Sequence, residues 1–165
     1  MLGASERPSV GRTIVENLDR IGFEGEVYPV NPRYETLLGR RCYRSIEELP
    51  AGVDVLAFCV NHERVLDGLR SAALKGVRAA VAFDAGFAES DDAGRRRQDE
   101  LVAICREAGI AFCGPNCMGV VNTDPKVRLN ATFAGARPER GTAAFVSQSG
   151  ALGEAILANA RSLGL

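Results

Sequence analysis

The feature that most constrains the fold is a nearly continuous apolar run from Val53 to Val60, followed directly by a helical pattern over 62–75. Such a run is typical of a strand buried on both faces of a parallel sheet, because helices cover both sides. The order then recurs, with an apolar run over 77–83, a helical pattern from 90 to 108 and a short apolar run over 110–113. Alternating strands and helices with short connections predict an α/β fold with a doubly wound parallel sheet.

A glycine-containing loop opens the chain, from Gly3 to Gly11, and a helical apolar stripe follows it. Ser9 is a suitable N-cap residue for that helix. Glycines allow the backbone to approach a ligand, and the free N–H groups and dipole of a helix start favour phosphate. With a second strand expected over 26–30, the segment has the order of a βαβ nucleotide-binding unit. An ordinary glycine turn before a helix is the alternative, because the spacing is not G-x-G-x-x-G.

Composition excludes several classes of function. The 20 Lys and Arg residues balance the 21 Asp and Glu residues, so no basic surface argues for a nucleic-acid or membrane partner. A single histidine, His62, argues against a Ser-His-Asp or Cys-His catalytic arrangement, and no metal site is expected from the pair Cys113 and Cys117 alone. The five cysteines lie mostly in apolar runs, which predicts a reducing cytoplasm. No apolar run is long enough to span a bilayer, and no signal peptide is expected.

In a doubly wound sheet, ligands bind at the carboxyl ends of the strands. The loops at those ends are expected to be Gly3–Gly11, Asn31–Arg33, Asn61–His62, Ala85–Glu89 and Gly114–Gly119.

The remainder of the chain predicts a second unit. Residues 120–140 contain the breakers Asp124-Pro125 and Arg137-Pro138 and indicate an irregular linker or crossover. A strand over 142–146, the turn Ser147-Gln148-Ser149-Gly150 and a helix over 151–163 follow. We therefore predict a domain over 1–122, a linker over 123–140 and the start of a second domain over 141–165, with the fold continuing beyond Leu165.

Six stretches, in register with the expected strand ends, resemble the CoA-binding domain of NDP-forming acyl-CoA synthetases and of the succinyl-CoA synthetase α-subunit. The stretches are Gly3-Ala4-Ser5 through Gly11, Val27-Tyr28-Pro29-Val30-Asn31-Pro32, Ala85-Gly86-Phe87-Ala88-Glu89, Gly114-Pro115-Asn116-Cys117-Met118-Gly119, Leu129-Asn130-Ala131-Thr132-Phe133 and Ser147-Gln148-Ser149-Gly150-Ala151. The resemblance implies a Rossmann-like CoA-binding domain followed by the start of a flavodoxin-like ligase domain.

The resemblance also implies which residues bind coenzyme A. On the first, phosphate-contacting loop these are Gly3, Ser5, Arg7, Ser9 and Gly11. The second loop contributes Asn31, Pro32 and the cation Arg33, the third Val60 and Asn61, the fourth Ala85, Gly86, Phe87 and Glu89, and the fifth Asn116 near the thiol. Ser149 and Gly150 begin a helix that stabilises a phosphoryl group in this family.

Several residues have simpler explanations that the sequence leaves open. Arg33 is alternatively a surface cation, Glu89 a solvated loop acid or helix cap, and Asn116 a turn residue. Cys117 fits a buried thiol better than a nucleophile, since no base lies near it in sequence. The third loop reads Val60-Asn61-His62 where the family usually has Val-Pro, so the contact to adenine there is open.

The expected function is the CoA-binding portion of an enzyme that converts acid, CoA and ATP to acyl-CoA, ADP and phosphate through an acyl phosphate and a phosphohistidine. The resemblance implies that the ATP, ADP and magnesium sites lie in an ATP-grasp domain or subunit, and the parent enzyme is expected to be oligomeric. Because this stretch contains neither the phosphorylated histidine nor the ATP-grasp module, we expect no catalysis from it alone. The alternatives are a regulatory CoA-binding module, as in protein-lysine acetyltransferases, and an NAD(P)-dependent oxidoreductase. The acyl substrate and the choice between ADP and GDP are not encoded in these residues.

Overall fold

The computed structural model of the chain describes residues 1–136, 138–160 and 162. The helices in these residues are α1 (Val10–Ile21), α2 (Val65–Leu74), α3 (Asp92–Ala108) and α4 (Gly150–Asn159), and a 3-10 turn η1 (His62–Arg64) leads into α2. The strands are β1 (Thr36–Leu37), β2 (Arg40–Arg41), β3 (Val55–Phe58), β4 (Ala79–Ala82), β5 (Ala111–Cys113), β6 (Gly119–Asn122) and β7 (Leu129–Thr132). The predicted strands over 53–60, 77–83 and 110–113 and the predicted helices over 62–75 and 90–108 are confirmed in their central residues.

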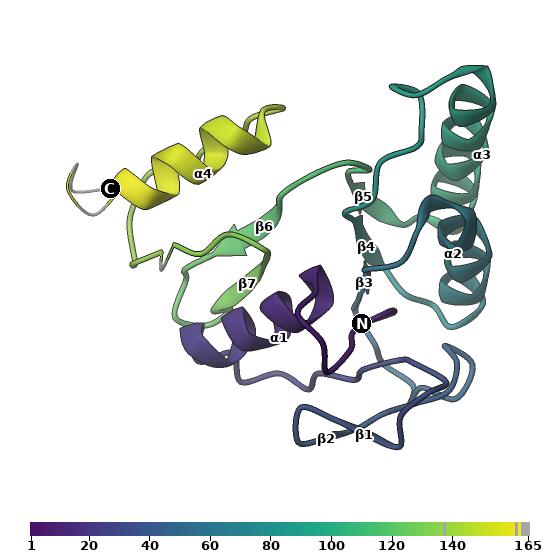
Figure 1. Cartoon of the computed structure of the whole chain (residues 1–165), viewed down its shortest axis with the longest axis horizontal. Coiled ribbons are helices and arrows are strands. Elements are labelled where there is room, and N and C mark those ends of the chain that lie inside the picture. The colour runs from purple at the N-terminus through teal and green to yellow at the C-terminus, as the bar shows by residue number, and fades with distance from the viewer. Residues whose placement is uncertain (137, 161, 163–165) are drawn as a thin grey trace.

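The apolar runs form a parallel sheet in the order β3-β4-β5 (Figure 1). Leu2 extends this sheet, because it forms parallel bridges to both Phe58 and Val30, and Val30 bridges in parallel to Tyr43. Across the sheet the order is therefore Tyr43, Val30, Leu2, β3, β4 and β5. In chain order this is third, second, first, fourth, fifth and sixth, which is the doubly wound Rossmann order. The order reverses between Leu2 and β3, so the ligand crevice is expected there.

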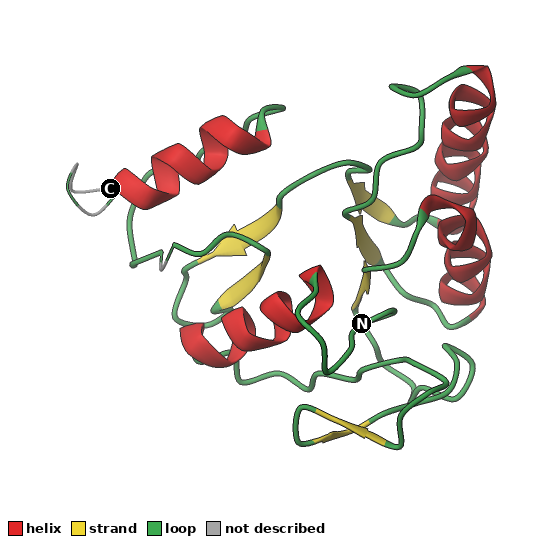
Figure 2. Cartoon of the chain, viewed as in Figure 1, coloured by secondary structure: helices red, strands yellow, loops and turns green. Residues whose placement is uncertain are grey.

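The second predicted strand is shorter than expected. Of residues 26–30 only Val30 pairs, and the segment between α1 and β1 is drawn as loop (Figure 2). Val30 donates its N–H to the carbonyl of Met1 at 2.7 Å, whereas Pro29 has no N–H to donate and offers only its carbonyl, to Tyr43 at 2.9 Å. The prolines at 29 and 32 limit the ladder on either side of Val30.

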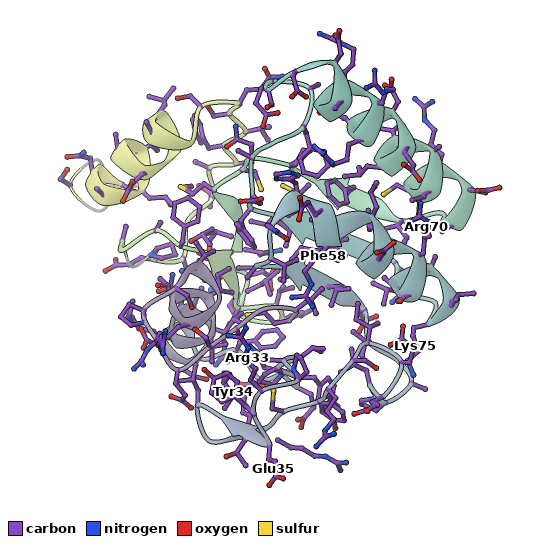
Figure 3. The ribbon with its side chains drawn as sticks, turned by 45° about the vertical axis from the view of Figure 1, so that its right-hand side comes forward. Arg33, Tyr34, Glu35, Phe58, Arg70 and Lys75 are labelled. Carbon is purple, nitrogen blue, oxygen red and sulfur yellow. The ribbon has the colours of Figure 1, made fainter. Side chains whose placement is uncertain are left out.

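Helices cover both faces of the sheet, α2 and α3 on one side and α1 with the β6–β7 hairpin on the other (Figure 1). Successive β3 residues alternate between the two faces, so that Leu56 and Phe58 pack toward α2 while Ala57 packs toward α1. Phe58 is fully buried in the interior (Figure 3). A Cβ on Gly68 of α2 would lie 2.5 Å from the Phe58 ring, so the close packing of this helix on the sheet requires glycine there.

The prediction of an irregular crossover over 120–140 is wrong for residues 120–132, which belong to a hairpin. β6 and β7 form an antiparallel hairpin with Gly119 opposite Thr132. The buried amide of Asn17 in α1 holds it, donating to the carbonyl of Thr132 at 2.8 Å and to that of Ala134 at 3.0 Å. Asp124-Pro125 lies in the hairpin connection, where turn residues belong, and Arg137 lies outside the described residues. The hairpin crosses the expected boundary at 122/123.

The C-terminal segment differs from its prediction in one element. The strand predicted over 142–146 is wrong: these residues have no strand partner in the described part of the chain, and the side chains of Phe145 and Val146 are exposed. An extended segment needs a neighbouring ladder to become a strand. The predicted helix is confirmed as α4, although residues 161 and 163–165 lie outside the described residues. Gly153 of α4 packs near Met118, with 3.1 Å between a Cβ built there and the methionine methyl.

Within the described residues, the helices are too short or too polar to cross a bilayer.

Candidate functional site

The first loop is built around two close backbone approaches. Gly3 has a φ of +92°, and a Cβ there would lie 2.4 Å from the carbonyl oxygen of Cys59 and 2.6 Å from Val60. The first and third loops are therefore in direct contact on the two sides of the reversal point. A Cβ on Gly11 would lie 2.8 Å from the Cα of Ala4, so the start of α1 packs directly on its own loop.

The start of α1 faces the same end of the sheet, since the helix directly follows the first strand position. The Oγ of Ser9 accepts the Arg12 N–H at 3.2 Å and caps the helix. Ser5 lies 3.3 Å from Ser9, hydroxyl to hydroxyl, and also donates to the carbonyl of Arg7 at 3.2 Å. The predicted residues of this loop thus lie together, with both hydroxyls ordering the loop and the positive end of the helix dipole behind them. Arg7 is exposed and has no ion pair within the described residues.

Asn31 connects the second loop to the first. Its Nδ2 donates to the carbonyl of Ala4 at 2.9 Å, and its Oδ1 accepts the N–H of Arg33 at 3.1 Å. The Asn31 amide is thus occupied in positioning the two loops, while Pro32 beside it is exposed. The Arg33 side chain is exposed on the loop that leads to β1 (Figure 3), and no ion pair engages it in the part of the chain that the structure describes. Its guanidinium is therefore available to an anion.

The third loop carries His62 as well as the predicted Val60 and Asn61. Val60 is half-buried against Gly3, and Asn61 is exposed, with its amide 3.4 Å from the carboxylate of Glu63. His62 donates its backbone N–H to Oδ2 of Asp84 at 2.7 Å, and its ring Nδ1 lies 3.3 Å from the same oxygen.

The fourth loop is closed by Glu89. Its Oε1 accepts the N–H groups of Gly86 at 2.7 Å and Phe87 at 3.1 Å. Partial burial opposes ionisation, but the N–H groups of Glu89 itself, Phe87 and Gly86 outweigh it and lower the pKa of the Glu89 carboxyl. Glu89 is thus an exposed loop acid that orders its own loop, and it does not cap a helix, because Asp91 is the N-cap of α3. Ala85, the other predicted residue of this loop, is exposed.

Arg97 of α3 holds the fourth loop from behind. Its guanidinium donates to the carbonyl of Gly86 and lies 5.9 Å from the centre of the Phe87 ring. Its neighbours Arg95 and Arg96 are exposed on the solvated face of the helix. Arg97 of α3 therefore stabilises the fourth loop from outside it.

The fifth loop places Asn116 at its tip, exposed and with a φ of +52°. Its backbone N–H donates to the carbonyl of Asp84 at 3.0 Å. Beside it the thiol of Cys117 donates to the carbonyl of Ala82 at 3.3 Å, and burial with the nearby Cys113 raises the pKa of Cys117 to about 12. A thiol held protonated in this way supports the structural interpretation of Cys117.

Asp84 is the residue that sequence reasoning missed. Its carboxylate holds the third loop through His62, and its carbonyl holds the fifth loop through Asn116. Its position in the sequence could have identified it, because Asp84 is a single acidic residue between the apolar run over 77–83 and a loop that contains glycine. At the carboxyl end of a parallel strand, such an acid is placed to accept N–H groups from the loops on either side.

The second predicted site lies at the start of α4. Ser149 accepts the Leu152 N–H at 3.3 Å and donates its own N–H to the hydroxyl of Ser147 at 2.9 Å. Ser149 and Gly150 are exposed. The cap is formed as expected, and its role toward phosphate remains a prediction.

Two cavities lie to the side of the edge where the five loops meet, and both touch the fifth loop only. One of about 540 Å³ lies beside α3 and β5 and meets the loops only at Gly114 and Pro115. The other, of about 220 Å³, lies between the β6–β7 hairpin and α4. In the described residues no group of His, Cys, Asp and Glu is arranged to hold a metal ion. The candidate site is therefore the open edge of the sheet where the five loops meet.

At this edge the N-terminus of α1 lies at the reversal point of a sheet with the Rossmann strand order. These features define the class of the domain as nucleotide-binding. The chain belongs to the CoA-binding domain family, whose model matches residues 1–123.

Curated relatives are ligases. The ADP-forming acetate–CoA ligase I of Archaeoglobus fulgidus is 40% identical over 158 residues, which are 95% of this chain and 22% of the relative. The α-subunit of the ADP-forming acetate–CoA ligase II of Pyrococcus furiosus is also 40% identical, over 95% of this chain and 34% of that subunit. The ADP-forming 4-hydroxybutyrate–CoA ligase of Nitrosopumilus maritimus is 34% identical over 100% of this chain and 24% of its own length. The chain thus matches the CoA-binding portion of ADP-forming acyl-CoA synthetases and spans about a third of their length or less.

Solved structures agree with this fold. The apo form of acetyl-coenzyme A synthetase 1 from Candidatus Korarchaeum cryptofilum superposes with a TM-score of 0.90 at 36% identity, covering 99% of this chain and 35% of that one. The same enzyme in complex with phosphate and ADP gives a TM-score of 0.86 at 38% identity over 94% of this chain and 33% of that one. The predicted Rossmann-like α/β fold and the predicted family are confirmed.

Proposed function

We propose that coenzyme A binds across the five loops, with its phosphates at the start of α1. The observation that carries this is the reversal point between Leu2 and β3, where Gly3 brings the first and third loops into contact and α1 presents its N-terminus. The guanidiniums of Arg7 and Arg33, which form no ion pair with any described residue, lie on the two loops that Asn31 joins. Coenzyme A carries a pyrophosphate and a ribose phosphate, and guanidinium groups bind phosphate bidentately.

Each part of the site has a distinct task in this proposal. Free N–H groups in the first turn of α1 and the cations Arg7 and Arg33 hold phosphate charge. Asn31, Asp84 and Glu89 use the groups described above to keep the five loops in fixed positions, and those groups bind no ligand atom. Asn116 stands at the tip of the fifth loop, where the thiol end of coenzyme A is expected.

The complete protein is proposed to be an ADP-forming acyl-CoA synthetase, because its relatives carry that activity in their names. An ATP-grasp domain or subunit would supply ATP, ADP and magnesium, and α4 would begin a flavodoxin-like ligase domain in which Ser149 and Gly150 face phosphate. An oligomeric enzyme in a reducing cytoplasm fits the free thiols of the described cysteines.

Isothermal titration of the purified protein with coenzyme A, dephospho-CoA and NAD tests the proposal. We expect coenzyme A to bind most tightly, because it alone carries the ribose phosphate. Preference for NAD would instead support the oxidoreductase alternative, and a folded sample that binds none of the three would refute the proposal. Binding of coenzyme A by a complete protein that forms no acyl-CoA from acid and ATP would support the regulatory alternative.

A further inference from the structure

His62 is held in one orientation by three neighbours. Oδ2 of Asp84 contacts both its backbone N–H and its ring Nδ1. Gly86 lies against the imidazole so closely that a Cβ there would be 2.4 Å from Nδ1. The Phe87 ring packs edge-on at 6.4 Å between centroids. These contacts fix the orientation of the imidazole ring at the edge of the third loop.

The contact with Asp84 fixes which ring nitrogen carries the proton. A carboxylate only accepts hydrogen bonds, so the neutral imidazole must carry its proton on Nδ1. Nε2 is then a lone-pair acceptor. No hydrogen bond from the described residues ends on Nε2, and about a third of the His62 side chain is exposed.

The position of His62 relates this acceptor to the ligand. The third loop follows β3, one of the two strand positions that border the reversal point, and it contacts the first loop at Gly3. Ligands in such sheets lie between those two loops.

We infer that His62 is a ligand-contacting residue whose Nε2 accepts a hydrogen bond from an N–H group of coenzyme A, with Asp84 as its positioning residue. This inference rests on the proposed function. Coenzyme A offers such donors in two places, the amino group of its base and the amides of its pantetheine arm. An acceptor at this place disfavours a ligand that presents only acceptors there.

The experiment compares wild-type protein with His62→Phe, which keeps an aromatic ring but removes both nitrogens. Titrations use coenzyme A, its deaminated analogue with a hypoxanthine base, and adenosine 3′,5′-bisphosphate, which lacks the pantetheine arm. At about pH 8, where histidine is normally neutral, we expect His62→Phe to bind coenzyme A about 3- to 10-fold more weakly, as for one neutral hydrogen bond. If the base is the donor, the wild-type preference over the deaminated analogue disappears in the variant. If the arm is the donor, adenosine bisphosphate binds both proteins equally.

A spectroscopic readout separates contact from a merely structural effect. His62 is the only histidine, so a long-range ¹H–¹⁵N spectrum of untagged protein shows one imidazole. We expect an Nδ1-protonated ring whose Nε2 resonance moves when coenzyme A is added. Asp84→Asn should mix the tautomers and weaken binding, whereas the matched carboxylate variant Asp67→Asn, on the exposed face of α2, should do neither.

The outcomes distinguish this inference from the proposed function. Wild-type protein that binds no coenzyme A refutes the proposed function. Wild-type and His62→Phe proteins that bind all three ligands alike, or an Nε2 resonance that coenzyme A does not move, refute the role of His62 alone.

Discussion

Replacing Gly3 by alanine tests the close contact between the first and third loops. Two costs arise from the structure. A φ of +92° is unfavourable for a residue with a Cβ, at about 1–2 kcal/mol. The added Cβ would also lie 2.4 Å from the Cys59 carbonyl, and forcing one loop away from the other is comparable to overpacking a core, at about 1–3 kcal/mol. Gly3→Ala should therefore lower the free energy of unfolding by about 2–5 kcal/mol.

Gly52 provides a matched control. Its φ of +83° is similar, but nothing lies within 4 Å of a Cβ built there. Gly52→Ala should lose only the conformational part, about 1–2 kcal/mol.

Urea unfolding of the wild type and both variants measures the difference. A Gly3→Ala protein that is no less stable than Gly52→Ala would refute a costly contact between the loops, since they would then separate without cost. Binding gives a second measurement. At a urea-free condition where both variants are folded, Gly3→Ala should bind coenzyme A more weakly, whereas Gly52→Ala should match the wild type.

Three further predictions concern single side chains. Arg33→Ala should weaken coenzyme A binding about 10- to 100-fold by titration, less so at high salt, because a charged hydrogen bond is lost and exposed charges are screened; equal binding at low salt would leave Arg33 a surface cation. Asn17→Ala should lower the free energy of unfolding by about 2–4 kcal/mol, because the carbonyls of Thr132 and Ala134 lose a buried donor; a smaller loss in urea unfolding would mean that water reaches them. Glu89→Gln should be less stable than the wild type at neutral pH. Because the pKa of Glu89 is lowered on folding, the difference in free energy of unfolding is fully present above about pH 4.3 and shrinks as the pH falls below that value. A difference that stays constant across a series of acidic pH values would contradict the contact with Gly86.

The sheet could be predicted because a strand that is buried on both faces has a nearly continuous run of apolar residues. Val53 to Val60 has almost no polar residue, and the helices that follow each strand have clear apolar stripes. The family resemblance added the positions of the loops. These signals depend on residues close together in the chain, and the structure confirms the fold they predicted.

The features that were missed depend on contacts between distant segments. The β6–β7 hairpin is fixed by Asn17, more than a hundred residues earlier, and nothing in residues 129–132 alone announces that partner. The strand predicted over 142–146 has strand-like residues but no ladder to join in the described chain. Asp84 has the composition of any loop acid, and only its two neighbouring loops reveal what it holds.

In the candidate site, sequence placed the loops correctly in relation to one another but did not separate ligand contacts from supports. The resemblance groups Asn31 and Glu89 with the residues that contact coenzyme A. In the structure the Asn31 amide and Oε1 of Glu89 form hydrogen bonds with loop backbone. A sequence motif indicates that a residue is needed at a site, but it does not show whether the side chain contacts the ligand or a neighbouring loop. Contact of the predicted residues with coenzyme A, Asn31 and Glu89 included, stays a prediction.

Three of the five loops share one arrangement: the first, third and fifth are each tied by a group that belongs to another part of the same sheet edge. Asn31 of the second loop holds the first, and Asp84 at the end of β4 holds the third and the fifth. The entropy of ordering these loops is therefore lost when the chain folds, before any ligand arrives. An incoming ligand meets a preorganised surface, so its association rate should follow diffusion and electrostatic attraction, with no slow loop closure to wait for.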